Sequence, residues 1–429
     1  MKLEKLNINK NKRIIISLVI FIVLIVTITL LTTRSKYRVT QSLELAKGTV
    51  NYTIPDFNLI DVYVEENGAY KGTDTIPQSG YTLNEEKSYC AINGEKDTTI
   101  TIEYSDGNLN VNGLSKKGTK CYVYFDKMPY TCKGVACEAI MANMNAWKTR
   151  SSFDSVVTDT TTGVIYKSLD ENQYDDNGEV YYFAGNPSDN WVKFGGFYWR
   201  IIRINGDGTI RMIYQGTAAN ITGNETQIGT SVFNTNDDDN MYVGYQYTGG
   251  KAHGTGTDST VKEVLDNWYN NNLKDYGKYI ATGGGASFCN DRTPYSGSGI
   301  GITETNYVTY NRLVTNKIPT FKCTDTEDRF AISVGLITAD DVSYAGGVFN
   351  TNNSGYYLYT GEYYWTMSPY YFDPSYIYPV RVFLMWSDGY LVAGNVNANG
   401  FSGVRPVINL KADITFTGSG TSSDPYVVS

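Results

Sequence analysis

The chain has 429 residues, and its 36 Lys and Arg against 44 Asp and Glu give a net charge of −8. At roughly 150 residues per domain, the length predicts two or three folded units, and a content of only 19% charged residues excludes a charge-driven disordered chain or a coiled coil. The acidic balance argues against nucleic acid as a partner, and the single histidine, His253, excludes most zinc sites and histidine-based catalytic sites.

The first expected element is a transmembrane helix at residues 14–33, whose sequence IIISLVIFIVLIVTITLLTT contains no charge. At about 1.5 Å per residue, a helix of 20 residues covers the roughly 30 Å hydrocarbon core of a bilayer. A cleaved signal peptide is the alternative, but its apolar region is usually about 7–15 residues long and ends at a small-residue cleavage site. The longer run, without a good cleavage site, predicts an uncleaved single-pass anchor.

The charged flanks of this span set its expected orientation. Five basic residues precede it and three follow closely, and short flanks enriched in Lys and Arg stay in the cytoplasm. Residues 1–13 are then a cytoplasmic tail, and residues 34–48 are a polar stalk. The expected location is the cell membrane, with the N-terminus cytoplasmic and the bulk of the protein extracellular.

All six cysteines follow the span, and an even number in an exported chain indicates disulfides. Several pairings are possible, and closeness in sequence favours one set. A metal site or free thiols are the alternatives, although a C-x4-C spacing without a second close pair does not match structural zinc. The expected pairs are Cys90–Cys121, Cys132–Cys137 and Cys289–Cys323.

Residues 49–130 alternate apolar and polar residues with period two, and Asn-Gly and Asp-Gly turns separate the runs. This pattern predicts a small β-sandwich-like domain. Its expected role is to space the next domain from the membrane, with a binding site of its own as the alternative. The clearest expected strands are Leu59–Val64, Thr98–Tyr104 and Cys121–Phe125.

Residues 131–177 are expected to be a helix followed by a linker. Apolar residues recur at helical spacing over residues 131–150, and a Thr-, Ser- and Asp-rich stretch follows. The apolar residues with this spacing are Ala136, Ala139, Ile140, Met144 and Trp147.

Residues 178–429 are expected to form an α+β domain dominated by antiparallel sheet. Two β-branched runs, Phe197–Ile204 and Thr209–Tyr214, flank an Asn-Gly-Asp-Gly turn and predict a β-hairpin. A calcium loop is the alternative for this turn, but the EF-hand spacing is missing. A helix is expected at residues 260–273, with Val261, Val264, Leu265, Trp268 and Leu273 on its apolar face and Lys262, Glu263, Asn267 and Asn270 opposite.

The segment Thr338–Asp341 resembles a capping box that opens a short helix ending at Gly346. The preceding run, Ala331–Ile337, reads as a buried strand. Further strands are expected at Tyr363–Met367, Val380–Trp386, Gly389–Ala393 and Val404–Leu410.

Four motifs in this domain resemble a module of bacterial membrane-anchored surface proteins, in the same order along the chain. The strand–helix–strand order of that module is similar to the C-type-lectin-like fold, which sulfatase-modifying factors also have. The resemblance therefore implies a lectin-like scaffold for residues 178–429. The motifs are W-R-I-I-R-I-N-G-D-G at 199–208, G-L-I-T-A-D-D at 335–341, Y-W-T-M-S-P at 364–369 and G-V-R-P-V at 403–407.

The sequence departs from the active members of that superfamily in two respects. Calcium-dependent sugar-binding lectins carry E-P-N or Q-P-D, and neither tripeptide occurs here. Formylglycine-generating enzymes use paired cysteines in their C-terminal part, whereas no cysteine follows Cys323. The resemblance implies the scaffold and neither activity.

Candidate ligand-binding residues come from a tyrosine-rich segment at residues 356–386. Flat rings with a polar tip suit sugar faces or protein partners, although many rings on strands belong to the core. Trp199, Trp365 and Arg405 are expected to pack in the core, whereas the tyrosines at 370, 371, 376 and 378 are expected to be exposed on loops. The candidates are Tyr370, Tyr371, Tyr376, Tyr378 and Trp386.

A cluster of oxygen ligands at Asp237, Asp238 and Asp239 could hold a hard cation such as Ca²⁺, with a solvated acidic loop as the alternative. No other cofactor is expected. No catalytic residue is assigned: Glu362 and Asp388 could be cast as a glycosidase pair, but nothing in the sequence brings them together.

These features predict a membrane-anchored extracellular protein that presents a lectin-like domain to a glycan or a protein. The expected partners are the membrane, through one N-terminal helix, and an extracellular glycan or protein, with no nucleic acid. A cell-envelope enzyme acting on glycans or exported proteins and a purely structural envelope protein are the alternatives.

Overall fold

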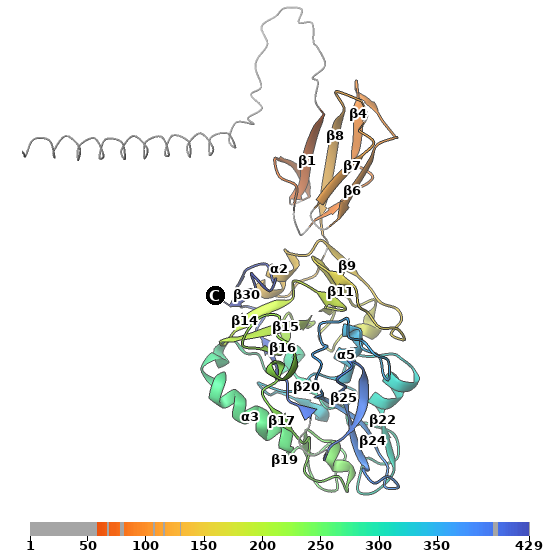
Figure 1. Cartoon of the computed structure of the whole chain (residues 1–429), viewed down its shortest axis with the longest axis vertical. Coiled ribbons are helices and arrows are strands. Elements are labelled where there is room, and N and C mark those ends of the chain that lie inside the picture. Colours follow the sequence, from red (N-terminus) through yellow and green to blue (C-terminus); the bar gives the residue numbers. More distant parts are fainter. Residues whose placement is uncertain are drawn as a thin grey trace, which may run out of the picture. The chain divides into compact units, whose positions relative to one another are not determined.

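The computed structural model describes residues 58–428, except for short gaps at 67, 78–80, 106–107, 115, 129 and 398–401 (Figure 1). The predicted tail, membrane span and stalk lie outside these residues. Within the described part, no helix is both long enough and apolar enough to cross a bilayer. The described chain is mostly β, as predicted, with curled sheets and short helices.

Six of the eight strands between residues 59 and 127 form one sheet with a small core of its own, and β6 and β7 form a separate hairpin. β1 and β8 pair in parallel, and β8 also pairs with β3 and β4 in the antiparallel sense. Apolar residues of the β6–β7 hairpin pack on the core residues Val62, Val123 and Phe125, which gives the two layers of a small sandwich. The strands are β1 (Leu59–Glu66), β2 (Ala69–Thr73), β3 (Tyr81–Leu83), β4 (Tyr89–Ile92), β5 (Glu95–Lys96), β6 (Thr101–Ser105), β7 (Asn108–Asn112) and β8 (Lys120–Lys127).

All three predicted disulfides are present, so the six cysteines are fully paired. Cys90–Cys121 joins β4 to β8, where the two cysteines are cross-strand neighbours. Cys132–Cys137 closes a short loop at the start of helix α2, and Cys289–Cys323 joins strand β20 to a loop 34 residues further along the chain.

Residues 131–177 differ from the expected helix and linker. α2 (Val135–Met141) is shorter than predicted, and the tryptophan expected on it lies on strand β9 (Ala146–Lys148). The backbone N–H of Asn145 and of the next residue both donate to the carbonyl of Gly163, and this draws the chain out of the helix and into a sheet. The segment therefore belongs to the main sheet and core formed by residues 131–428, which we call the larger unit.

The main sheet of this unit has nine strands and is organised around the predicted hairpin, which is confirmed. β15 pairs with β16, and β16 continues to β28 in the G-V-R-P region. The strands are β9 (Ala146–Lys148), β11 (Val164–Lys167), β12 (Tyr181–Tyr182), β14 (Trp191–Phe194), β15 (Phe197–Ile204), β16 (Ile210–Gly216), β28 (Val407–Leu410), β29 (Phe416–Thr417) and β30 (Tyr426–Val428).

A second sheet of seven strands carries the tyrosine-rich segment. Its strands β22, β24 and β25 lie side by side (Figure 1), and all three pair in the antiparallel sense. Since Thr305 pairs with Phe372, the loop before β22 (297–304) and the loop after β24 (373–379) leave the sheet at the same end. The strands are β17 (Thr230–Ser231), β21 (Pro294–Ser296), β22 (Thr305–Tyr307), β24 (Tyr364–Phe372), β25 (Val380–Met385), β26 (Leu391–Asn395) and β27 (Ser402–Gly403).

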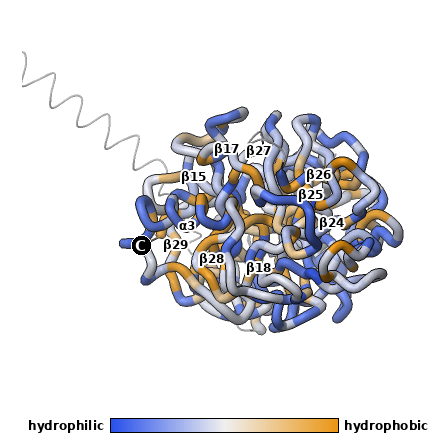
Figure 2. The backbone as a smooth tube through the Cα atoms, turned by 90° about the horizontal axis from the view of Figure 1, so that it is seen from below, coloured by the Kyte–Doolittle hydropathy of each residue, from blue (hydrophilic) through white to orange (hydrophobic). Residues whose placement is uncertain are grey.

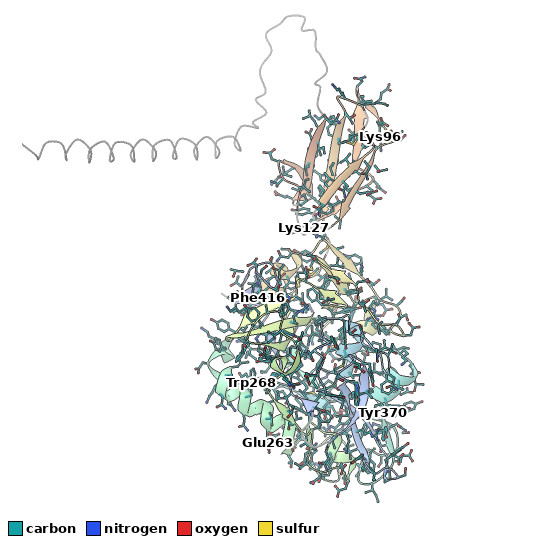
Figure 3. All side chains as sticks on the ribbon, viewed as in Figure 1. Lys96, Lys127, Glu263, Trp268, Tyr370 and Phe416 are labelled. Atoms are coloured by element: carbon teal, nitrogen blue, oxygen red, sulfur yellow. A yellow bond between two sulfur atoms is a disulfide. The ribbon has the colours of Figure 1, made fainter. Side chains whose placement is uncertain are left out.

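Helix α3 (Thr260–Asn272) confirms the predicted amphipathic helix, and its side chains Glu263 and Trp268 are labelled in Figure 3. Its predicted apolar residues are buried or pack on the core. One residue differs: Lys262, expected on the exposed face, is buried because its ammonium lies between the carboxylates of Asp258 and Asp266.

Helix α5 (Ala339–Ala345) confirms the capping box. The Thr338 hydroxyl accepts from the backbone N–H of Asp341, whose carboxylate accepts from the Thr338 N–H in return. The helix ends at Gly346, which adopts the left-handed conformation at φ 111°.

The expected strand at Ala331–Ile337 is wrong in part. Its second half is buried, but it makes only a single bridge, in which Gly335 and Val407 exchange two backbone hydrogen bonds. The ring of Phe288 lies against Gly335, where an added Cβ would meet it at 2.4 Å. A glycine at this position therefore allows the ring of Phe288 to pack against the backbone.

The core of the larger unit lies between its sheets and helices. Hydrophobic segments around β28 lie inside a rim of hydrophilic loops (Figure 2). The shorter strands are β10 (Thr160–Thr161), β13 (Asn186–Pro187), β18 (Gln246–Tyr247), β19 (Thr257–Asp258), β20 (Phe288–Cys289) and β23 (Arg329–Phe330). The remaining helical turns are η1 (Glu171–Gln173), η2 (Gly223–Thr226), η3 (Asn240–Val243), η4 (Lys274–Tyr279), η5 (Gly284–Ala286), α4 (Val308–Tyr310), η6 (Asn311–Thr315) and η7 (Thr326–Asp328).

Candidate functional site

Three residues of the conspicuous motifs serve the core, as predicted. Trp199 and Trp365 are fully buried, and each indole N–H donates to a backbone carbonyl. Arg405 is also buried, and its guanidinium donates to the carbonyls of Tyr214 and Leu358. These three side chains are buried in the core and are not accessible to a ligand.

A small charged cavity of about 40 Å³ lies beside the start of α5. Arg312 on its wall pairs with Asp291 at 2.7 Å and with Asp340 at 2.8 Å, and Arg203 pairs with Asp341 at 2.8 Å. A water molecule needs roughly 10–15 Å³ of such space, so the cavity is sized for about three waters. This volume suits water molecules that hydrate the buried ion pairs, and it is too small for a sugar ring.

A larger and more open hollow lies on the seven-stranded sheet, with a volume of about 340 Å³. We name it the tyrosine groove. Its walls come from the start of β22 and the helical turn after it, and from β24, the following loop and β25. The lining residues are Glu304, Asn306, Tyr310, Tyr370–Asp373, Tyr376 and Arg381.

The strand register shows which side chains form the floor of the groove. Asn306 on β22 pairs with Tyr371 on β24, and Tyr371 in turn pairs with Arg381 on β25. Directly paired residues on neighbouring strands project from the same face of a sheet. The three side chains therefore form one row across three strands.

Two tyrosine rings hold the guanidinium of Arg381. Its central carbon lies 5.4 Å from the ring centroid of Tyr371 and 5.6 Å from that of Tyr376. The two rings are themselves 6.0 Å apart. Both distances to Arg381 are in the range of cation–π attraction, which fixes the position of an otherwise flexible side chain.

The loop that carries Tyr376 is held by its own hydrogen bonds. The Asp373 N–H donates to the Pro379 carbonyl at 3.0 Å, and the Asp373 carboxylate accepts from the backbone and the hydroxyl of Ser375. The Tyr376 N–H donates to the Asp373 carbonyl at 3.2 Å. These bonds fix the loop in one conformation, so the groove exists before any ligand arrives.

The electrostatics of the groove are mixed. Arg381 supplies a positive charge, and Glu304 and Asp373 supply carboxylates on the same lining. Burial raises the pKa of Tyr371, and the nearby Arg381 acts in the opposite direction. With a raised pKa, Tyr371 stays a neutral phenol at neutral pH and can donate a hydrogen bond.

The structure brings together three of the five predicted ligand-binding residues. Tyr376 is exposed on a loop, as expected. Tyr370 and Tyr371 were wrongly expected on a loop, because both lie on β24: Tyr371 is half-buried on the groove surface, and Tyr370, labelled in Figure 3, is 8% exposed. β24 runs to Phe372, past the end predicted from the sequence, and this turns Tyr370 into the core against the ring of Phe383. Tyr370 thus supports the groove from below.

The other two predicted residues lie elsewhere. Tyr378 is 55% exposed and belongs to the same loop as Tyr376, but it is not part of the groove lining. Trp386 is half-buried and packs on the rings of Tyr363 and Tyr390.

One residue of the acidic cluster has a structural role as a helix cap. The Asp239 carboxylate accepts from the N–H of Met241 and so caps η3. Among the residues that the structure describes, no group of three or more His, Cys, Asp or Glu side chains is placed to hold a metal ion, and this includes Asp237–Asp239. Calcium dependence therefore stays a prediction from sequence alone.

The two carboxylates considered as a glycosidase pair are not part of either hollow described above. Neither Glu362 nor Asp388 lines the charged cavity or the tyrosine groove.

Sequence reasoning missed four polar residues of the groove: Glu304, Asn306, Asp373 and Arg381. Only Arg381 left a signal, since it is the one charged residue in the strand sequence Val380–Met385, which is otherwise apolar. Such a residue has to project from the outer face of its strand. Glu304 and Asn306 lie about 50 residues before the tyrosine-rich segment, and only the fold brings them to it.

No protein family, curated protein or solved structure was found to match this chain.

Proposed function

We propose that this protein is a single-pass surface protein that holds a C-type-lectin-like module outside the cell, where the tyrosine groove binds a glycan. The observation that carries the proposal is the pairing of two accessible tyrosine rings with polar side chains in a preformed hollow. Sugar rings have apolar faces that stack on aromatic rings and a rim of hydroxyls that needs hydrogen-bond partners. The motif resemblance and the hydrophobic segment at residues 14–33 support the scaffold and the anchor.

The structure offers a matched pair of variants for testing the groove. Tyr376 and Tyr378 are 53% and 55% exposed on the same loop, but only Tyr376 lines the groove. The full-length protein in detergent is applied to a glycan array, and the bound glycans are titrated. We expect Tyr376→Ala to weaken binding about fivefold, the effect of losing one aromatic contact of about 1 kcal/mol, and Tyr378→Ala to leave it unchanged.

Two results would count against this function. If no glycan binds, or if both variants lose binding equally, the groove is not a sugar site. The topology has its own test: protease added to intact cells should remove the region after residue 48, and full protection of that region would contradict the extracellular placement.

A further inference from the structure

Arg381 stands apart from the other arginines of the described chain. Each of the others donates hydrogen bonds or forms an ion pair, as Arg312 does with two carboxylates and Arg405 with carbonyl oxygens. For Arg381 the described residues provide neither, and its Nε is buried without a partner. Its terminal N–H groups are not among the buried unpaired atoms and have no hydrogen bond within the described residues, so they are open to an acceptor that comes from outside the chain.

The guanidinium is positioned for such an acceptor. It lies between the rings of Tyr371 and Tyr376, on the row of side chains that crosses three strands. A planar guanidinium presents parallel N–H donors that match the two oxygens of a carboxylate. Because the two rings already hold it, little side-chain entropy is lost when an anion binds.

The groove also limits the charge of its ligand. Glu304 and Asp373 line the same hollow, and their carboxylates repel dense negative charge while they can accept hydrogen bonds from hydroxyl groups. The complementary ligand has a single carboxylate surrounded by hydroxyls and at least one apolar face. A sugar acid within a mostly neutral chain has all three properties.

We infer that the tyrosine groove selects acidic glycans, in which a sugar carboxylate pairs with Arg381 while sugar faces lie on Tyr371 and Tyr376. This inference rests on the proposed function and names the ligand class of the same site. Affinity comes from the rings and the hydroxyl contacts, and the preference for the acid comes from Arg381.

The test uses full-length protein in detergent and a panel of uronate-containing polysaccharides, each paired with its carboxyl-reduced, neutral form. We expect every bound acid form to bind at least about tenfold more tightly than its reduced partner, and added salt to diminish this preference. Arg381→Met should abolish the preference, so that the acid and reduced forms of each polysaccharide bind equally. An unchanged unfolding midpoint shows that the variant is folded.

Two further variants sharpen the assignment. Arg381→Lys keeps the charge but loses the planar fork, so it should retain only part of the preference. Glu304→Gln removes a competing carboxylate and should raise affinity for the acid forms about twofold or more relative to the reduced forms.

The outcomes separate this inference from the function on which it rests. Equal binding of acid and reduced forms, or a preference that survives Arg381→Met, overturns the carboxylate assignment and leaves glycan binding intact. If no polysaccharide of either form binds and the groove instead takes an acidic peptide, both proposals fail.

Discussion

The guanidinium of Arg405 donates to the carbonyl oxygen of Tyr214 through both Nε, at 3.2 Å, and Nη2, at 2.9 Å. Tyr214 belongs to β16, whereas Arg405 belongs to the G-V-R-P-V motif some 190 residues later, just before β28. A third contact, to the carbonyl of Leu358, reaches the segment that leads into β24. One buried side chain therefore connects parts of both sheets, which explains its place in a conspicuous motif.

Arg405→Met should destabilise the larger unit by about 3 kcal/mol or more, because it removes the buried hydrogen bonds to the carbonyls of Tyr214 and Leu358 and to the side-chain oxygen of Gln215. Chemical denaturation measures this as a loss in the free energy of unfolding. Arg381→Met is the matched control, since that side chain has no hydrogen bond to lose. It should change stability by about 0.5 kcal/mol or less. Equal effects of the two variants would contradict the structural role of Arg405.

Alanine substitutions at two glycines can distinguish the cost of a left-handed backbone conformation from the cost of a steric clash. Gly208 and Gly196 have nearly the same φ, +87° and +86°, but a Cβ on Gly208 would lie 1.5 Å from the Lys133 carbonyl oxygen, whereas a Cβ on Gly196 would meet nothing within 4 Å. Gly196→Ala should cost about 1–2 kcal/mol for the left-handed conformation alone. Gly208→Ala should cost at least about 2 kcal/mol more, measured by denaturation. Similar costs would show that the turn can move away from Lys133.

The capping box at α5 makes a further stability prediction. Thr338→Ala removes the acceptor for the Asp341 N–H and should cost about 1 kcal/mol, whereas Thr338→Ser keeps the hydroxyl and should cost much less. Thermal unfolding of the two variants measures the difference. A loss shared by both would point to packing of the threonine methyl group rather than to the cap.

Burial raises the pKa of Asp189 to about 6, although its hydrogen bond from Gly163 and the charge of Arg200 act in the other direction. A carboxyl with a raised pKa favours the folded state when it is protonated. Its contribution is fully present below about pH 4, the unfolded value, and is lost as the pH rises through about 6. At about 1.4 kcal/mol per pKa unit, the loss amounts to about 3 kcal/mol between pH 4 and pH 7.

Asp189→Asn should therefore be more stable than wild type at pH 7 by up to about 3 kcal/mol, with no such gain at pH 4. Denaturation at several pH values measures the difference. Asp388→Asn, at an exposed position, controls for the general loss of one negative charge. A difference between Asp189→Asn and wild type that stays constant with pH would contradict the raised pKa.

Features that depend on a few neighbouring residues could be predicted from the sequence. The β15–β16 hairpin follows from two β-branched runs around Asn-Gly-Asp-Gly, and the α5 cap follows from Thr338 and Asp341 three residues apart. The disulfides join cysteines that are consecutive in the chain, at separations of 31, 5 and 34 residues. For the hairpin and the cap, the deciding interactions are local.

The groove could not be predicted from the sequence, because it depends on how strands pair with one another. It needs β22, β24 and β25 side by side in one register, so that Asn306, Tyr371 and Arg381 share a row. The pattern of tyrosines correctly indicated that Tyr376 is exposed on a loop, but Tyr370 and Tyr371 could be placed on a strand only once the length of β24 was known. The helix expected over 131–150 failed for a similar reason, since its second half pairs with the distant strand β11.

The antiparallel pairing of β22 with β24 places residues 297–304 and 373–379 at one end of the sheet, outside its hydrogen-bonded ladder. Exposed apolar side chains mark both tips, with Ile302 at 73% and Ile377 at 86% exposure. Substitutions confined to these two exposed side chains should leave the paired strands and the core unchanged. The two tips can therefore be randomised to build a library of variants on one framework.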